Sequence, residues 1–326
     1  MEGRLHSWPM PVGADGWRHL RAIRISAPIR ELLTNGTRDG SVVSTHRAAV
    51  NLSLDGVLVT VAHPQLGGLP MGISLAGQAT LDRLALRPRM RVEGRADRVS
   101  IGDARLAIDL AAAATWSPLL PALDVIPAAD RADRMALSMR LARPLATAVG
   151  FGPLLGALAA DAHTGDGLAA RAAALLASVL DALSGGEMSV AALRARELIG
   201  LGPGATPSGD DLLVGLMAGL AATGHPGTKA FAGHVAAQAP GRTTQLGEAF
   251  LVHAGKLQFS ERAQTAVVAM LAARPDRLES VIHETCRWGA SSGTDLLTGL
   301  LIGIGADLPS TTAALRRISD HAAVAA

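Results

Sequence analysis

Tyrosine is absent from this sequence, cysteine occurs once, lysine occurs twice, and aromatic residues make up only 2% of the chain. Without tyrosine no phenolic hydroxyl can act as a general acid, and the core must be built from leucine, alanine and valine. The single cysteine, Cys286, cannot form an internal disulfide, which suits a reducing compartment. The first residues, MEGRLHSWPM, lack the apolar stretch of a signal peptide. We therefore expect a cytoplasmic protein.

Strong charge and long apolar runs are missing as well. The formal net charge is +2, and no basic cluster is interleaved with aromatics, so we expect no nucleic-acid partner. The longest apolar stretches, 212–222 and 296–306, are much shorter than the roughly 18 residues that suggest a membrane span. We therefore expect no membrane partner either.

Hydrophobic periodicity divides the chain into two parts. Between about 40 and 115 the period is near two, and Asp55-Gly56 between two apolar runs predicts a hairpin. From about 128 onward the spacing is helical. It predicts helices over 130–143, 166–184, 187–199, 211–222, 228–238, 243–254, 260–274, 276–287, 293–304 and 310–324. With a proline-containing loop at 116–127 between them, we predict an α+β protein with an antiparallel β-rich domain, 1–125, and a mainly α-helical domain, 126–326.

The helical part contains nearly the same phrase twice. TPSGDDLLVGLMAG (206–219) and ASSGTDLLTGLLIG (290–303) share eight residues at a constant offset of 84. Such an echo indicates an internal pseudo-repeat of two copies. Each copy carries glycines four apart, Gly215 with Gly219 and Gly299 with Gly303, which would let two helices cross closely and bring their starts together.

Each copy also has the pattern of a helix start. Ser208 with Asp211, and Ser292 with Asp295, have the spacing of a capping box. The loop before the first copy, 200–205, has three glycines that permit positive φ and close approach to a ligand. Helix N-termini attract anions. Two ordinary caps and one shared anion site are both open interpretations.

Two further sets of polar residues are candidates. Arg242, Thr243 and Thr244 follow a Pro-Gly turn and open another predicted helix, and arginine suits carboxylate or phosphate. The oxygen ligands of Asp210, Asp211 and Asp295 make Mg²⁺ possible. No other cofactor is expected, because the histidines lack zinc-ligand spacing.

The phrases GPGATPSGDDLLVGLMAG (202–219), SSGTDLLTGLLIG (291–303), HRAAVNL (46–52) and GLPMGI (68–73) resemble those of a known bacterial family. That family, AllH-like and first catalogued as a domain of unknown function, is associated with a subunit of oxamate carbamoyltransferase. The resemblance implies carbamoyl transfer between carbamoyl phosphate and oxamate, with oxalurate and phosphate on the other side, in allantoin and purine nitrogen catabolism. It also implies small anionic substrates and other subunits as partners.

On this basis we assign candidate roles. Asp211 and Asp295 would orient the amide or cap the helices, and Arg242 would hold a carboxylate or phosphate. The expected substrate-binding residues surround the helix starts: Gly202, Gly204, Thr206, Ser208, Gly209, Asp210, Thr243, Thr244, Ser291, Ser292 and Gly293. Two other functions stay open: a non-catalytic assembly or anion-sensing subunit, and a metal-dependent hydrolase of small amides.

Overall fold

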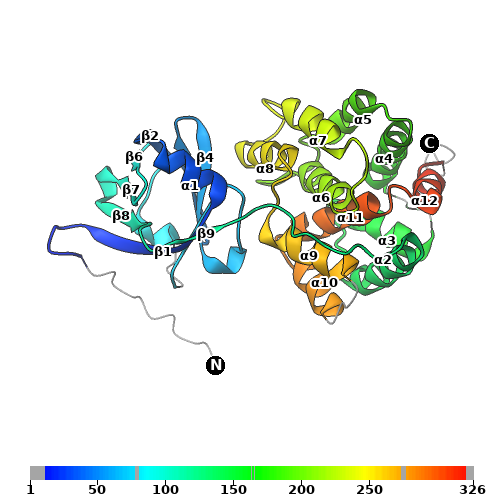
Figure 1. Cartoon of the computed structure of the whole chain (residues 1–326), viewed down its shortest axis with the longest axis horizontal. Helices are drawn as coiled ribbons and strands as arrows, with labels where there is room; N and C mark the ends of the chain where they lie inside the picture. Colours follow the sequence, from blue (N-terminus) through cyan, green and yellow to red (C-terminus); the bar gives the residue numbers. More distant parts are fainter. Residues whose placement is uncertain (1–11, 78–80, 163, 165, 273–276, 321–326) are drawn as a thin grey trace. The chain divides into compact units, whose positions relative to one another are not determined.

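The computed structural model describes residues 12–77, 81–162, 164, 166–272 and 277–320, and Figure 1 shows its elements. The chain divides into two compact units, Met1–Pro118 and Leu119–Ala326. The division falls inside the predicted loop 116–127. Parts of three predicted helices, at 273–276 and 321–324, lie outside the described residues.

The first unit is a sheet that closes on itself. Its strands are β1 (Arg18–Ser26), β2 (Arg38–Thr45), β3 (Ala49–Leu54), β4 (Val57–Ala62), β5 (Gly72–Leu75), β6 (Arg91–Gly94), β7 (Arg98–Ile101), β8 (Leu106–Asp109) and β9 (Ala114–Trp116), with helix α1 (Ala27–Thr34) after β1. The strand order is β5-β4-β3-β2-β6-β7-β8-β1-β9, and β1 also pairs with β5. That additional pairing gives the sheet a barrel-like form.

The predicted hairpin is confirmed. Strands β3 and β4 pair antiparallel, with Leu54 opposite Val57. The two residues between them have positive φ, 48° for Asp55 and 81° for Gly56. Positive φ at both positions is the type I′ geometry that matches the twist of a two-residue hairpin.

The expectation of a purely antiparallel sheet is wrong. Strand β1 runs parallel to β8 and to β9, and β4 runs parallel to β5. Alternation of apolar residues shows which face of a strand is buried, but it carries no information about the direction of the neighbouring strand.

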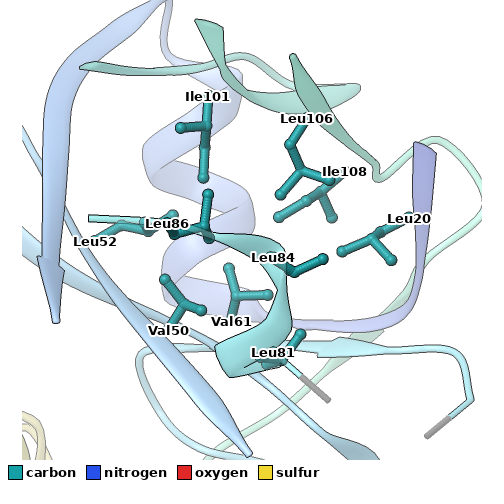
Figure 2. A pocket seen from close by; sticks show the side chains of 10 residues that line it. All are labelled: Leu20, Val50, Leu52, Val61, Leu81, Leu84, Leu86, Ile101, Leu106 and Ile108. Carbon is teal, nitrogen blue, oxygen red and sulfur yellow. The ribbon is translucent and has the colours of Figure 1, made fainter. Parts of the chain in front are cut away.

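The inside of the barrel is filled by side chains. Ten apolar residues from five strands, the short 3₁₀ turn Leu81–Leu84 and the chain just after it line a cavity of about 10 Å³ (Figure 2). They are Leu20, Val50, Leu52, Val61, Leu81, Leu84, Leu86, Ile101, Leu106 and Ile108. A space of this size holds one water molecule at most, and the lining offers it no polar group. The barrel interior is therefore a packed core and not a ligand pocket.

The second unit is built from helices. They are α2 (Ala128–Ala142), α3 (Gly152–Ala160), α4 (Gly167–Ser184), α5 (Met188–Ala195), α6 (Ser208–Ala222), α7 (Thr228–Ala237), α8 (Gln245–Gly255), α9 (Glu261–Leu271), α10 (Leu278–Cys286), α11 (Ser292–Ile304) and α12 (Pro309–Asp320). Helix α3 was not predicted. Figure 1 shows α6 and α11 in the middle of this unit, and nearly all their residues are buried.

Helix α4 is, among the described residues, long and apolar enough to cross a membrane by length and composition alone. However, 56% of it is buried within the helical unit, where it packs against α5 and α12. This burial is typical of a core helix, so α4 is weak support for a membrane span.

Candidate functional site

Helices α6 and α11 lie side by side and run in the same direction. Gly215 of α6 faces Leu296 and Leu300, while Gly219, one turn further, faces Leu300 and Ile304. A Cβ atom on Gly215 would overlap the carbonyl oxygen of Leu296, and one on Gly299 would overlap that of Leu212. The predicted close crossing through the glycine faces is therefore confirmed.

Because the helices are parallel, their N-terminal ends meet. The hydroxyl oxygens of Thr206 and Ser292 are 3.0 Å apart, and those of Ser208 and Ser291 are 3.4 Å apart. The starts of the two copies of the repeated phrase thus lie close together, as the sequence predicted.

The predicted capping boxes are wrong. Helix α6 has Pro207 as its N-cap and α11 has Ser291, and neither cap side chain accepts a hydrogen bond from a backbone N–H of its own helix. Ser208 and Ser292 are already the first helical residues of their helices. Their hydroxyl groups therefore interact across the helix pair instead of with their own helix.

The cross-helix contacts are reciprocal. The hydroxyls of Ser292 and Thr206 form hydrogen bonds with the Asp211 carboxyl group. The hydroxyls of Ser208 and Ser291 form hydrogen bonds with the Asp295 carboxyl group. We call these six residues the serine–aspartate junction: Thr206, Ser208, Asp211, Ser291, Ser292 and Asp295.

Both acids of the junction have raised pKa values. Burial raises the pKa of Asp295 to about 6, although the Phe151 N–H and the hydroxyls of Ser208 and Ser291 oppose the rise. Burial raises the pKa of Asp211 well above its usual range, and the negative charges of Asp295 and Asp210 raise it further. Perturbed carboxyl groups gathered in one place are typical of functional sites, although structural networks produce them too.

A segment that the sequence analysis missed covers one side of the junction. The backbone N–H of Phe151 donates a 2.6 Å hydrogen bond to Oδ1 of Asp295. Gly150 has φ of 67°, and a Cβ there would lie 2.6 Å from Oδ1 of Asp295 and 2.7 Å from the hydroxyl oxygen of Ser208. The run of Gly150, Gly152 and Pro153 is a turn signal, but it does not reveal which side chain the turn contacts.

The third acid, Asp210, points away from the other two. Its carboxylate accepts hydrogen bonds from the Gly200 N–H, at 2.8 Å, and from the Thr243 hydroxyl. The Thr244 hydroxyl donates to the Ala205 carbonyl at 2.5 Å and also caps helix α8. Thr243 and Thr244 therefore fasten the start of α8 to the loop at 200–205.

Two of the backbone N–H groups predicted to bind an anion already donate hydrogen bonds within the protein. The N–H of Gly209 donates to the Leu201 carbonyl, and the N–H of Gly293 donates to the Trp288 carbonyl, both at 2.9 Å. Neither is free for a ligand in this state.

Other predicted features of the loop are present. Gly202 and Gly204 adopt positive φ, 101° and 111°, as expected for this loop. The side chain of Arg242 is exposed, and its guanidinium has no ion pair among the described residues. Its carbonyl oxygen lies against Gly200.

Metal ligands do not gather in the described part of the chain, where no group of three or more histidine, cysteine, aspartate or glutamate residues is placed to hold an ion. The contacts of Asp210 explain why the expected set of three aspartates does not form. Mg²⁺ binding stays a prediction.

The two units define the class of this protein: an α+β protein with a barrel-like sheet and a helical unit that holds a buried junction of acids and hydroxyls. Residues 21–115 match the AllH family N-terminal domain, and residues 198–304 match the family described as oxamate carbamoyltransferase subunit AllH. The chain belongs to this family. No curated protein and no solved structure matches it.

Proposed function

We propose that this chain is a subunit of a cytoplasmic carbamoyltransferase that acts on oxamate and carbamoyl phosphate in allantoin breakdown. The family supports a subunit role in a complex. The observation that carries the proposal further is the serine–aspartate junction, where two buried acids and four hydroxyls meet at two helix starts.

The reaction requires one proton transfer. The amide nitrogen of oxamate bonds to the carbamoyl carbon, and the bond from that carbon to the phosphate oxygen breaks. Phosphate leaves with the bonding electrons, and the nitrogen gives up a proton. A carboxylate whose pKa is about 6, such as that of Asp295, accepts a proton more readily than one with an ordinary pKa.

The electrostatics of the junction also suit a small anion. Two ionised acids would repel it, but the strongly raised pKa of Asp211 favours its neutral form. The positive ends of the α6 and α11 dipoles point to the same place. In this proposal Asp211 and Asp295 orient the amide group, and Arg242 binds the carboxylate or phosphate.

A second candidate is a non-catalytic assembly or anion-sensing subunit. It is favoured by the full burial of Asp295 and by the use of the Gly209 and Gly293 N–H groups within the protein. In that case the junction would join two helices, and the reacting groups would come from other subunits.

The test is to co-purify the chain with the products of its neighbouring genes and to measure oxalurate and phosphate formation. We expect Asp211→Asn and Asp295→Asn each to lower turnover about 100-fold, the scale of a lost acid–base or electrostatic contact. The melting temperature should not fall, because asparagine keeps local hydrogen bonds and brings no charge into the buried site.

The matched control is Asp181→Asn. Asp181 forms an exposed ion pair with Arg316, and such pairs contribute little, so turnover should be unchanged. If both junction variants retain full activity while omission of the chain abolishes it, the assembly role is correct and the catalytic role is wrong.

A further inference from the structure

The two acids of the junction occupy equivalent places in the repeated phrase, but they differ in one contact. Each lies beside two hydroxyl groups that approach each other. Asp295 in addition receives the backbone N–H of Phe151. Within the described residues, Asp211 receives no such backbone N–H.

Asp211 has an acceptor atom that nothing in the described part of the protein satisfies. Its Oδ2 is buried and has no hydrogen-bond partner there. The same holds for Oδ2 of Asp295, but Gly150 lies against that carboxyl group and the Phe151 N–H already donates to it. The loop residues Pro203, Gly204 and Ala205, just before Thr206, are exposed. Buried acceptors without a donor are rare in folded proteins and call for a partner.

We infer that Asp211 accepts an N–H of a primary carboxamide ligand, in the role that the Phe151 peptide N–H has at Asp295. The inference rests on the proposed function and deepens it, because it assigns the amide end of the substrate to Asp211. The carboxyl group of Asp295, in contrast, is held by a donor of the protein itself, the Phe151 N–H.

The chemistry of the site selects an amide over a carboxylate. With its proton on the oxygen beside Thr206 and Ser292, a neutral Asp211 still has Oδ2 as an acceptor without a donor, and a carboxylate ligand offers it none at neutral pH. The hydroxyls of Thr206 and Ser292, 3.0 Å apart, can accept the second N–H of the amide. The raised pKa of Asp211 lowers its repulsion of the carboxylate at the other end of a ligand such as oxamate.

The experiment measures binding of oxamate, acetamide and their N,N-dimethyl derivatives to the complete chain in its complex by calorimetry. Each primary amide should bind the wild type about tenfold or more tightly than its dimethyl derivative, the scale of one buried hydrogen bond lost. Asp211→Ala should bring this ratio close to one. The control Asp181→Asn, outside the junction, should leave the ratio unchanged.

A measurement on the wild type covers the case in which Asp211→Ala does not fold. The amide protons of bound ¹⁵N-oxamate, or of ¹⁵N-acetamide if oxamate does not bind, should show nuclear Overhauser contacts to the Thr206 methyl group. Contacts only to other residues, equal binding of primary and dimethyl amides, no binding of either primary amide, or a ratio that survives Asp211→Ala would each overturn the inference.

The outcome also separates this inference from the proposed function. If acetamide shows the Asp211-dependent ratio and oxamate does not bind, the carboxamide site stands and the proposed substrate is wrong. If the complex turns over oxamate while Asp211→Ala leaves the ratio intact, the function stands and the assignment of Asp211 fails.

Discussion

At the scale of single residues, nearby hydrogen-bond donors offset part of the cost of burying the two carboxyl groups of the junction. Ser208 and Ser292 sit one position too far into their helices to cap them, so their hydroxyls reach the acid of the opposite helix. The Phe151 N–H makes Asp295 the better satisfied of the two acids. The burial of Asp295, which outweighs these donors, predicts a measurable effect of pH.

The pKa of Asp295 rises from 3.8 to about 6 on folding, so the native state binds more protons than the unfolded chain between these values. The contribution of Asp295 to stability is therefore complete below about pH 4 and is lost as pH rises through 6. Two pKa units correspond to roughly 3 kcal/mol. Urea unfolding from pH 4 to 7 should show this loss in the wild type and a flatter profile in Asp295→Asn. Parallel profiles for the two proteins would contradict the raised pKa of Asp295.

At the scale of secondary structure elements, the spacing of small residues decides how closely α6 and α11 approach. The glycines lie four apart on one face of each helix, which was visible in the sequence, and they contact the backbone of the other helix. Elements without a clear hydrophobic periodicity were harder to predict. Helix α3 carries two glycines in nine residues, and strand β1 precedes the region whose alternation was recognised.

Alanine at the crossing should destabilise the protein. In Gly215→Ala and Gly299→Ala the added methyl group would overlap a carbonyl oxygen of the other helix. We expect each to lower the free energy of unfolding by about 2 kcal/mol or more, as for overpacking in a core.

The control is Gly233→Ala in α7, where nothing lies within 4 Å of the added Cβ. This variant should gain about 0.5–1 kcal/mol from helix propensity. Similar free energies of unfolding for all three variants would rule out a tight crossing.

At the scale of the whole molecule, the chain consists of two units, each with its own apolar core and each matched by its own family description. Between them, residues 117–127 form no helix and no regular strand. Exposed connections of this kind are preferred sites of proteolysis.

Limited proteolysis with elastase, which cuts after small apolar residues, should therefore cleave first between 119 and 125. The resulting fragments should keep their secondary structure, with a β-type circular dichroism spectrum for the first unit and a helical one for the second. Rapid degradation of either fragment after this cut would show that its fold depends on the intact chain.

Features that depend on neighbouring residues could be predicted from the sequence. The helical period placed α6 and α11 within a few residues, Asp55-Gly56 specified the hairpin turn, and the repeated phrase pointed to the residues of the junction. Four features depend on tertiary packing and could not be predicted. The Ser208 hydroxyl and the Phe151 N–H donate hydrogen bonds to Asp295, Asp210 points toward Thr243, and β1 runs parallel to β8. The physical reason is that periodicity and turn propensity are properties of a local segment. The partner of a hydroxyl, a carboxylate or a strand edge is set by packing between segments far apart in the chain.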